Sequence, residues 1–120
     1  MNIDQIVAAV VDAIEDIKGK DIVVLDVSQQ SPLFERMVIA SADSSRQTRA
    51  IAQHVAEKLK EHGISGQGTE GMGHGEWVLL DLGSVIVHVM QPAVRQYYSL
   101  EALWTAGADQ RRQAGSPPSP

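Results

Sequence analysis

The stretch from Gly75 to Met90 constrains the fold most, because its pattern predicts two strands joined by a tight turn at Leu82-Gly83. Successive side chains of a strand point to opposite faces. One face of this hairpin is uniformly aliphatic and comprises Val78, Leu80, Leu82, Val85, Val87 and Val89. The other face is mixed and comprises Trp77, Leu79, Asp81, Ser84, Ile86, His88 and Met90. The first face is typical of a core lining, and the second is typical of a surface that contacts another molecule.

The position of Trp77 on the mixed face leaves two interpretations open. A two- or four-residue turn places Trp77 opposite His88 and Leu79 opposite Ile86. A tryptophan in a strand is most often part of the core. Here the aliphatic face is better suited to the core, and tryptophan is enriched at the centres of protein interfaces. Trp77 is therefore expected either in the core or at an interface.

Composition limits the class of protein. A chain of 120 residues with 43% hydrophobic and 21% charged residues is typical of one globular domain. The absence of cysteine excludes disulfides and thiolate zinc sites, and it favours a cytoplasmic location. The N-terminus does not have the pattern of a signal peptide, and no apolar stretch is long enough to span a bilayer. We therefore expect no membrane association.

The charge of the chain bears on its partners. The formal net charge is -5 at pH 7. Direct nucleic-acid binding depends on clustered lysine and arginine that contact phosphates, so this balance argues against it. An acidic surface is better suited to a basic protein partner.

Periodicity and turn residues predict the remaining elements. Ser44 is followed by Gln47 at the spacing of a capping box, which indicates the start of a helix. Pro92 is favourable in the first turn of a final helix. In chain order we expect a helix over 3–18 that ends at Gly19, antiparallel strands over 22–27 and 37–40, a helix from Ser44 to Gly63, a short strand within 64–70, the hairpin, and a helix from Pro92 that includes Trp104.

The order α-β-β-α-β-β-β-α predicts an α/β (α+β) fold with a mixed sheet of about five strands. Three helices cover both faces of such a sheet only with difficulty, so we expect the mixed face to be exposed. The domain is expected to span 1–106. Residues 107–120 are rich in glycine, serine and proline and are predicted to be a disordered tail.

Two segments of the chain have features of phosphate-binding sites. The glycines between Gly63 and Gly75 lead into a strand without a nearby lysine, whereas a phosphate loop requires Gly-Lys-Ser/Thr at the start of a helix. Ser41, Ser44, Ser45 and Arg46 lie at a predicted helix N-terminus, which is a possible anion site. Helix capping explains the same serines, so a nucleotide-handling enzyme that uses Ser44 to Arg46 stays as the alternative function.

Metal and acid-base sites are not indicated. The four histidines are His54, His62, His74 and His88, and they do not have the spacing of metal ligands. Asp81 lies near the turn and several residues along the ladder from His88, which does not suit a base and its orienting partner. No paired carboxylates of the type Asp-x-Asp are present. We therefore expect no catalytic residue, no metal and no cofactor.

The sequence as a whole resembles the ribosomal silencing factor family, also called Iojap-like. The resemblance covers roughly residues 3–105. It is carried by these segments: Val38-Ile39-Ala40-Ser41, Ser44-Ser45-Arg46-Gln47, Ala50-Ile51-Ala52, Glu70-Gly71, Glu76 to Gly83, Val85 to Met90, and the ending with Pro92, Arg95, Tyr98, Leu100-Glu101 and Leu103-Trp104.

The resemblance implies a fold and a function. The fold would be related to nucleotidyltransferases but without their catalytic carboxylates. The function would be non-enzymatic: the protein would bind the large ribosomal subunit through the basic ribosomal protein L-fourteen and block joining of the small subunit, which reduces translation when nutrients are short. A homodimer of the free protein is compatible with this. The residues expected at the partner-binding surface are Trp77, Leu79, Asp81, His88, Met90, Gln91, Arg95 and Tyr98.

Overall fold

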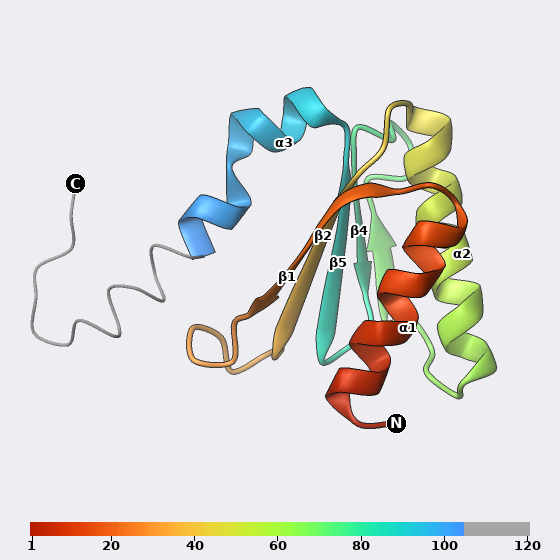
Figure 1. Cartoon of the computed structure of the whole chain (residues 1–120), viewed down its shortest axis with the longest axis vertical. Coiled ribbons are helices and arrows are strands. Elements are labelled where there is room, and N and C mark those ends of the chain that lie inside the picture. The colour runs from red at the N-terminus through yellow and green to blue at the C-terminus, as the bar shows by residue number, and fades with distance from the viewer. Residues whose placement is uncertain (105–120) are drawn as a thin grey trace, which may run out of the picture.

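A five-stranded mixed sheet organises the protein (Figure 1). This computed structural model describes residues 1–104, so the predicted tail over 107–120 lies outside the described residues. The order of helices and strands agrees with the prediction. The elements are α1 (Ile3–Asp16), β1 (Lys20–Asp26), β2 (Arg36–Ser41), α2 (Ser45–Glu61), β3 (Gly68–Glu70), β4 (Trp77–Asp81), β5 (Val85–Met90) and α3 (Pro92–Tyr98).

The strands are arranged in the order β1-β2-β5-β4-β3. β2 and β5 are parallel, and every other neighbouring pair is antiparallel. β2 and β5 are parallel because α2 returns the chain to the start of β3, and the two antiparallel reversals from β3 to β4 and from β4 to β5 then restore the direction of β2. This arrangement confirms the predicted mixed sheet.

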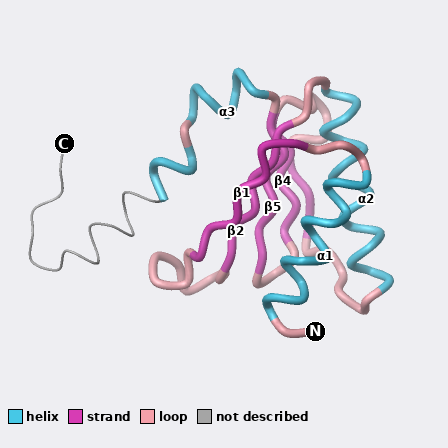
Figure 2. Tube along the Cα trace, viewed as in Figure 1, coloured by secondary structure: helices cyan, strands magenta, loops and turns pink. Residues whose placement is uncertain are grey.

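The two faces of the sheet are covered unequally. α1 and α2 lie together on one face, and α3 lies on the other side (Figure 2). The predicted aliphatic face of the hairpin packs under α1 and α2, and its six residues are buried. We call the opposite face, which carries Trp77 and His88, the second face. It has a smaller buried cluster made of Val27, Met37, Ile39 and Met90.

The predicted register of the hairpin was wrong by two residues. Trp77 lies opposite Met90, and Leu79 lies opposite His88. The turn residues are Gly83 and Ser84, one position later than predicted. Gly83 has a φ of 88°, which suits glycine at the first position of a two-residue turn, and its N–H donates to Asp81 Oδ1 at 2.8 Å. The Asp81 side chain therefore helps to set the turn.

The final helix is shorter than predicted. α3 ends at Tyr98 because Ser99 adopts a left-handed conformation, with φ 49° and ψ 46°. The chain is helical again over 100–104. This break redirects the chain, so that Leu100 and Trp104 pack against the buried cluster of the second face.

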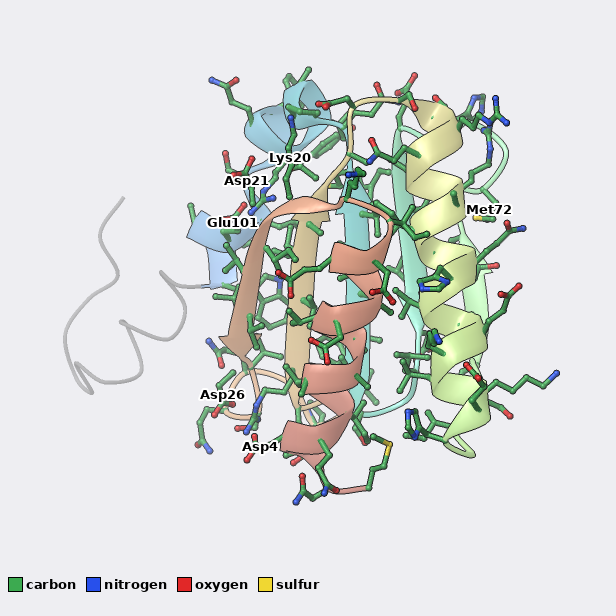
Figure 3. All side chains as sticks on the ribbon, turned by 45° about the vertical axis from the view of Figure 1, so that its right-hand side comes forward. Asp4, Lys20, Asp21, Asp26, Met72 and Glu101 are labelled. Carbon is green, nitrogen blue, oxygen red and sulfur yellow. The ribbon has the colours of Figure 1, made fainter. Side chains whose placement is uncertain are left out.

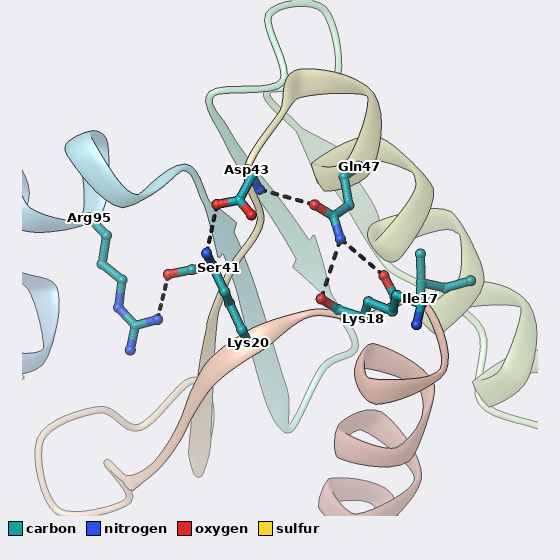
Figure 4. A network of polar contacts seen from close by, with 7 residues as sticks. All are labelled: Ile17, Lys18, Lys20, Ser41, Asp43, Gln47 and Arg95. Carbon is teal, nitrogen blue, oxygen red and sulfur yellow. Dashed lines mark hydrogen bonds and ion pairs between the residues drawn. The ribbon is translucent and has the colours of Figure 1, made fainter.

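Polar contacts join the ends of α1 and α2 (Figure 4). Ser44 caps α2 as predicted and accepts from the Gln47 N–H. The Gln47 side chain does not complete a capping box; it accepts from the Asp43 N–H and donates to the carbonyls of Ile17 and Lys18. α1 itself ends at Asp16, earlier than predicted, and Lys18 rather than Gly19 has the positive φ.

Substitution of Gly71 tests how closely the loop before β4 packs against that strand. It has a φ of 85°, and a Cβ atom there would overlap the carbonyl oxygen of Trp77. Gly83 has a similar φ but open space around it, so it is the matched control. We expect Gly83→Ala to cost about 1 kcal/mol of unfolding free energy. Gly71→Ala should cost roughly 3 kcal/mol or more, measured by chemical denaturation. Equal losses would contradict the close approach.

Candidate functional site

Trp77 and His88 are joined by a hydrogen bond on the second face. The Trp77 Nε1–H donates to His88 Nδ1 at 2.9 Å, and the ring centroids are 5.8 Å apart. The two residues are diagonal neighbours on adjacent strands, which is within reach of large side chains. The indole of Trp77 is half-buried, whereas His88 is only 5% exposed. The interaction therefore holds a partly exposed tryptophan on a buried support.

The hydrogen bond defines the protonation state of His88. A ring nitrogen that accepts a hydrogen bond carries no proton, so His88 is neutral with its proton on Nε2. Burial lowers the pKa of His88 to about 4 because desolvation disfavours the charged ring. The Trp77–His88 contact is thus intact at neutral pH.

Two tyrosines of α3 extend the aromatic surface that begins at Trp77. The ring of Tyr98 packs against that of Trp77 at 4.9 Å, and Tyr97 contacts Tyr98 at 5.0 Å. Tyr98 is 54% exposed and Tyr97 is 81% exposed. We call Trp77, Tyr97 and Tyr98 the aromatic patch. β4 supplies its base and the end of α3 supplies its exposed part.

Gln91 is used inside the protein. Its Nε2 donates to Ser45 Oγ at 2.9 Å and to the Gly75 carbonyl at 3.3 Å. Thr48 Oγ1 also donates to the Gly75 carbonyl. These contacts tie the loop before Trp77 to the start of α2. Gln91 therefore helps to fix the position of Trp77 through the loop that precedes it.

Arg95 is likewise engaged in internal contacts. Its Nε donates to Glu101 Oε1 at 2.6 Å. Its Nη1 donates to Ser41 Oγ at 2.8 Å (Figure 4). The side chain is only 12% exposed. Glu101 lies on the side of the sheet away from α1 and α2 (Figure 3). Arg95 thus fastens the segment after Ser99 to β2.

A groove of about 710 Å³ lies on the second face. Its floor comes from β2, β4 and β5, and its walls come from β3, from the loop before β2 and from the segment after Ser99. The lining residues are Leu33, Phe34, Met37, Gln67, Gly68, Thr69, Glu70, Leu79, Asp81, Gly83, Ile86, His88, Leu100, Leu103 and Trp104.

The structure separates the eight expected contact residues into two groups. Trp77, Leu79 and Asp81 are partly exposed and Tyr98 is exposed. The other four are buried or turned toward the protein's own groups, and they are His88, Met90, Gln91 and Arg95. The sequence interpretation did not include the groove walls. No local pattern identifies them, because Phe34 and Trp104 meet only in the folded chain.

The helix N-terminus at Ser44 is explained by protein contacts. Ser44 caps α2, and the Ser45 hydroxyl accepts from Gln91. Within residues 1–104, no group of three or more histidine, aspartate or glutamate side chains is placed to hold a metal ion. The same part of the chain contains no helix that is long and apolar enough to cross a membrane. A mixed sheet with an aromatic patch beside a groove has the features expected of a binding domain.

Comparison with known proteins identifies the family. Residues 1–119 match the family described as "Ribosomal silencing factor during starvation". The Ribosomal silencing factor RsfS of Chromobacterium violaceum is 55% identical over 104 residues, which are 87% of this chain and 85% of that protein. The chain belongs to the ribosomal silencing factor family, which confirms the resemblance and supports a ribosome-associated role in translational silencing.

Two further matches extend this comparison. A crystal structure of a Chromobacterium violaceum protein matches with a TM-score of 0.86 and 50% identity, and the match covers 99% of this chain and 92% of that one. A mouse protein named "Mitochondrial assembly of ribosomal large subunit protein 1" is 30% identical over 90 residues, which are 72% of this chain but 40% of that protein. The fold is thus shared with a close relative whose structure has been solved.

The buried His88 predicts a stability that depends on pH. In the unfolded state the histidine has a pKa near 6.5 and is protonated below that pH. In the folded state His88 stays neutral until the pH reaches about 4. Stability from this residue is therefore present above pH 6.5 and is lost as the pH falls toward 4. The loss is on the order of 3 kcal/mol. The free energy of unfolding, measured by chemical denaturation at a series of pH values, should fall less steeply between pH 6.5 and 4 for His88→Gln than for wild type. The control His62→Gln, at an exposed residue, should keep the wild-type slope. Equal slopes for all three would contradict the assignment.

Proposed function

We propose that this protein represses translation by binding the large ribosomal subunit through ribosomal protein L-fourteen, where it blocks joining of the small subunit. The aromatic patch is the observation that carries this proposal. Trp77 is held by His88 and covered on one side by the exposed Tyr98. Tryptophan and tyrosine are enriched among the residues that dominate binding energy.

The patch is suited to binding because it is already ordered. His88 holds the indole from below, and Gln91 and Thr48 hold the loop that precedes it. A side chain that is ordered before binding loses less conformational entropy when the partner arrives. Binding through such a patch requires no reaction, so we propose a non-enzymatic role without a cofactor.

Charge and family membership support the nature of the partner. A net charge of -5 suits a basic ribosomal protein and opposes direct contact with RNA phosphates. The name of the mouse relative refers to the large ribosomal subunit. We place the protein in the cytoplasm, where this partner is found. Since exposed apolar surface tends to be covered, we also propose that the free protein forms a homodimer through the aromatic patch.

Trp77→Ala and Tyr98→Ala test the aromatic patch. Truncation of Trp77 should cost about 2 kcal/mol or more of binding, which is roughly a 30-fold loss of affinity. The loss should be visible as reduced co-sedimentation with large ribosomal subunits and not with small ones. His62→Ala, an exposed change at the end of α2, is the control and should bind like wild type. Wild-type co-sedimentation by a folded Trp77→Ala protein would refute the role of Trp77.

Steric exclusion makes a separate prediction about subunit joining. Wild-type protein added to large subunits should reduce the light scattered when small subunits are mixed in. Trp77→Ala should reduce it only at correspondingly higher concentration, because fewer large subunits are occupied. A protein that binds large subunits but leaves joining unchanged would contradict the proposed mechanism of silencing.

A further inference from the structure

We infer that the groove is a second contact site, distinct from the aromatic patch, which accepts a short segment of a basic protein. The segment would carry an apolar side chain next to a lysine or arginine. This inference rests on the proposed function, because it assigns the protein partner to the same face of the sheet. The aromatic patch and the groove meet at His88, which supports Trp77 and lines the groove.

Strand alternation decides which side chains form the floor of the groove, and Leu79, Ile86 and Met37 are its apolar members. Leu79 lies opposite His88 on β4 and β5, and Ile86 lies opposite Asp81. The intervening residues point to the helices and belong to the main core. The side chains that point into the groove are therefore not used to hold α1 and α2, and Leu79 is only half-buried.

The walls of the groove are formed in the free protein. Trp104 packs edge-on against Phe34, with centroids 5.8 Å apart. Gln30 Nε2 donates to the Trp104 carbonyl at 3.0 Å. Together with the Arg95–Glu101 ion pair, these contacts fasten the segment after Ser99 across the second face. A groove with fixed walls can accept a partner without first ordering its own chain.

The rim and size of the groove suit more than one side chain. Leu33 is 82% exposed and Leu103 is 66% exposed, and both line the groove. Its volume of about 710 Å³ is in the range of sites that enclose a ligand. Exposed leucines beside an apolar floor favour an occupant that brings apolar surface of its own.

One end of the groove is acidic. Asp81 and Glu70 line it, and neither forms an ion pair within residues 1–104. Asp81 Oδ1 accepts from the Gly83 N–H, and Gly68, which lies opposite Asp81, has no side chain to cover the rest of the carboxylate. No lysine or arginine of the described chain lines the groove, and His88 is neutral. The site therefore favours a cation at this end.

This charge distinguishes between the two kinds of surface that a ribosomal subunit offers. RNA presents phosphates, which the carboxylates of Asp81 and Glu70 repel. A basic protein presents lysine and arginine, whose aliphatic stems pack on apolar surface while their charged ends reach acidic groups. An apolar floor with an acidic end thus fits a segment of basic protein.

Two variants test the groove, with large ribosomal subunits as the probe. Leu79→Trp fills the floor and should weaken co-sedimentation about 10-fold or more. Glu70→Gln/Asp81→Asn keeps the shape and removes both charges; it should weaken binding several-fold at low salt and reduce the salt dependence. Glu15→Gln/Glu57→Gln removes two exposed charges from α1 and α2 and is the matched control, expected to change binding little. Melting curves check that each variant is folded.

Other outcomes overturn the inference, and they can be told apart from a failure of the proposed function. If Trp77→Ala weakens binding while both groove variants bind like wild type, the aromatic patch stands and the groove is not a contact. Stronger binding by the charge variant would assign the groove to RNA. Conversion of a dimer to a monomer by Leu79→Trp, with unchanged affinity for the subunit, would assign it to a second copy. Failure of the wild-type protein to bind large subunits would refute the proposed function itself.

Discussion

The hydrogen bond from Trp77 to His88 connects the core of the protein to its exposed patch. A half-buried indole N–H requires an acceptor, because an unpaired buried donor costs free energy. His88 supplies that acceptor only while it is neutral, and burial keeps it so. The position of the half-buried tryptophan therefore depends on a residue that is itself only 5% exposed. The aromatic patch and the floor of the groove both rest on this pair.

The groove exists because the second face is covered incompletely. α1 and α2 pack side by side on the other face and contact β1, β2, β4 and β5, whereas α3 has seven residues and stops at Tyr98. The left-handed Ser99 then turns the chain so that Leu100 and Trp104 reach the buried cluster around Met37. The space left between this segment and the sheet is lined by apolar side chains.

The sequence predicted those features that depend on local chemistry. Alternation of β-branched residues separated the two faces of the hairpin, and Ser44 marked the start of α2. The register was missed because the turn depends on the Gly83 conformation and on the Asp81 side chain, which alternation does not report. The walls of the groove were missed for another reason. Phe34 and Trp104 are brought together by the whole fold, and neither carries a local signal of its partner.

Some of the eight expected contact residues are exposed and others hold the fold, and this difference affects how a loss of binding in a variant is interpreted. Gln91 and Arg95 bond to the protein's own groups, so their replacement would disturb the loop before Trp77 or the segment after Ser99. Such a change lowers stability and affinity together. Truncation of Tyr98 removes exposed aromatic surface together with its packing on Trp77. Affinity lost at unchanged stability therefore identifies the binding surface, and this comparison separates the two groups within the eight residues that the sequence placed together.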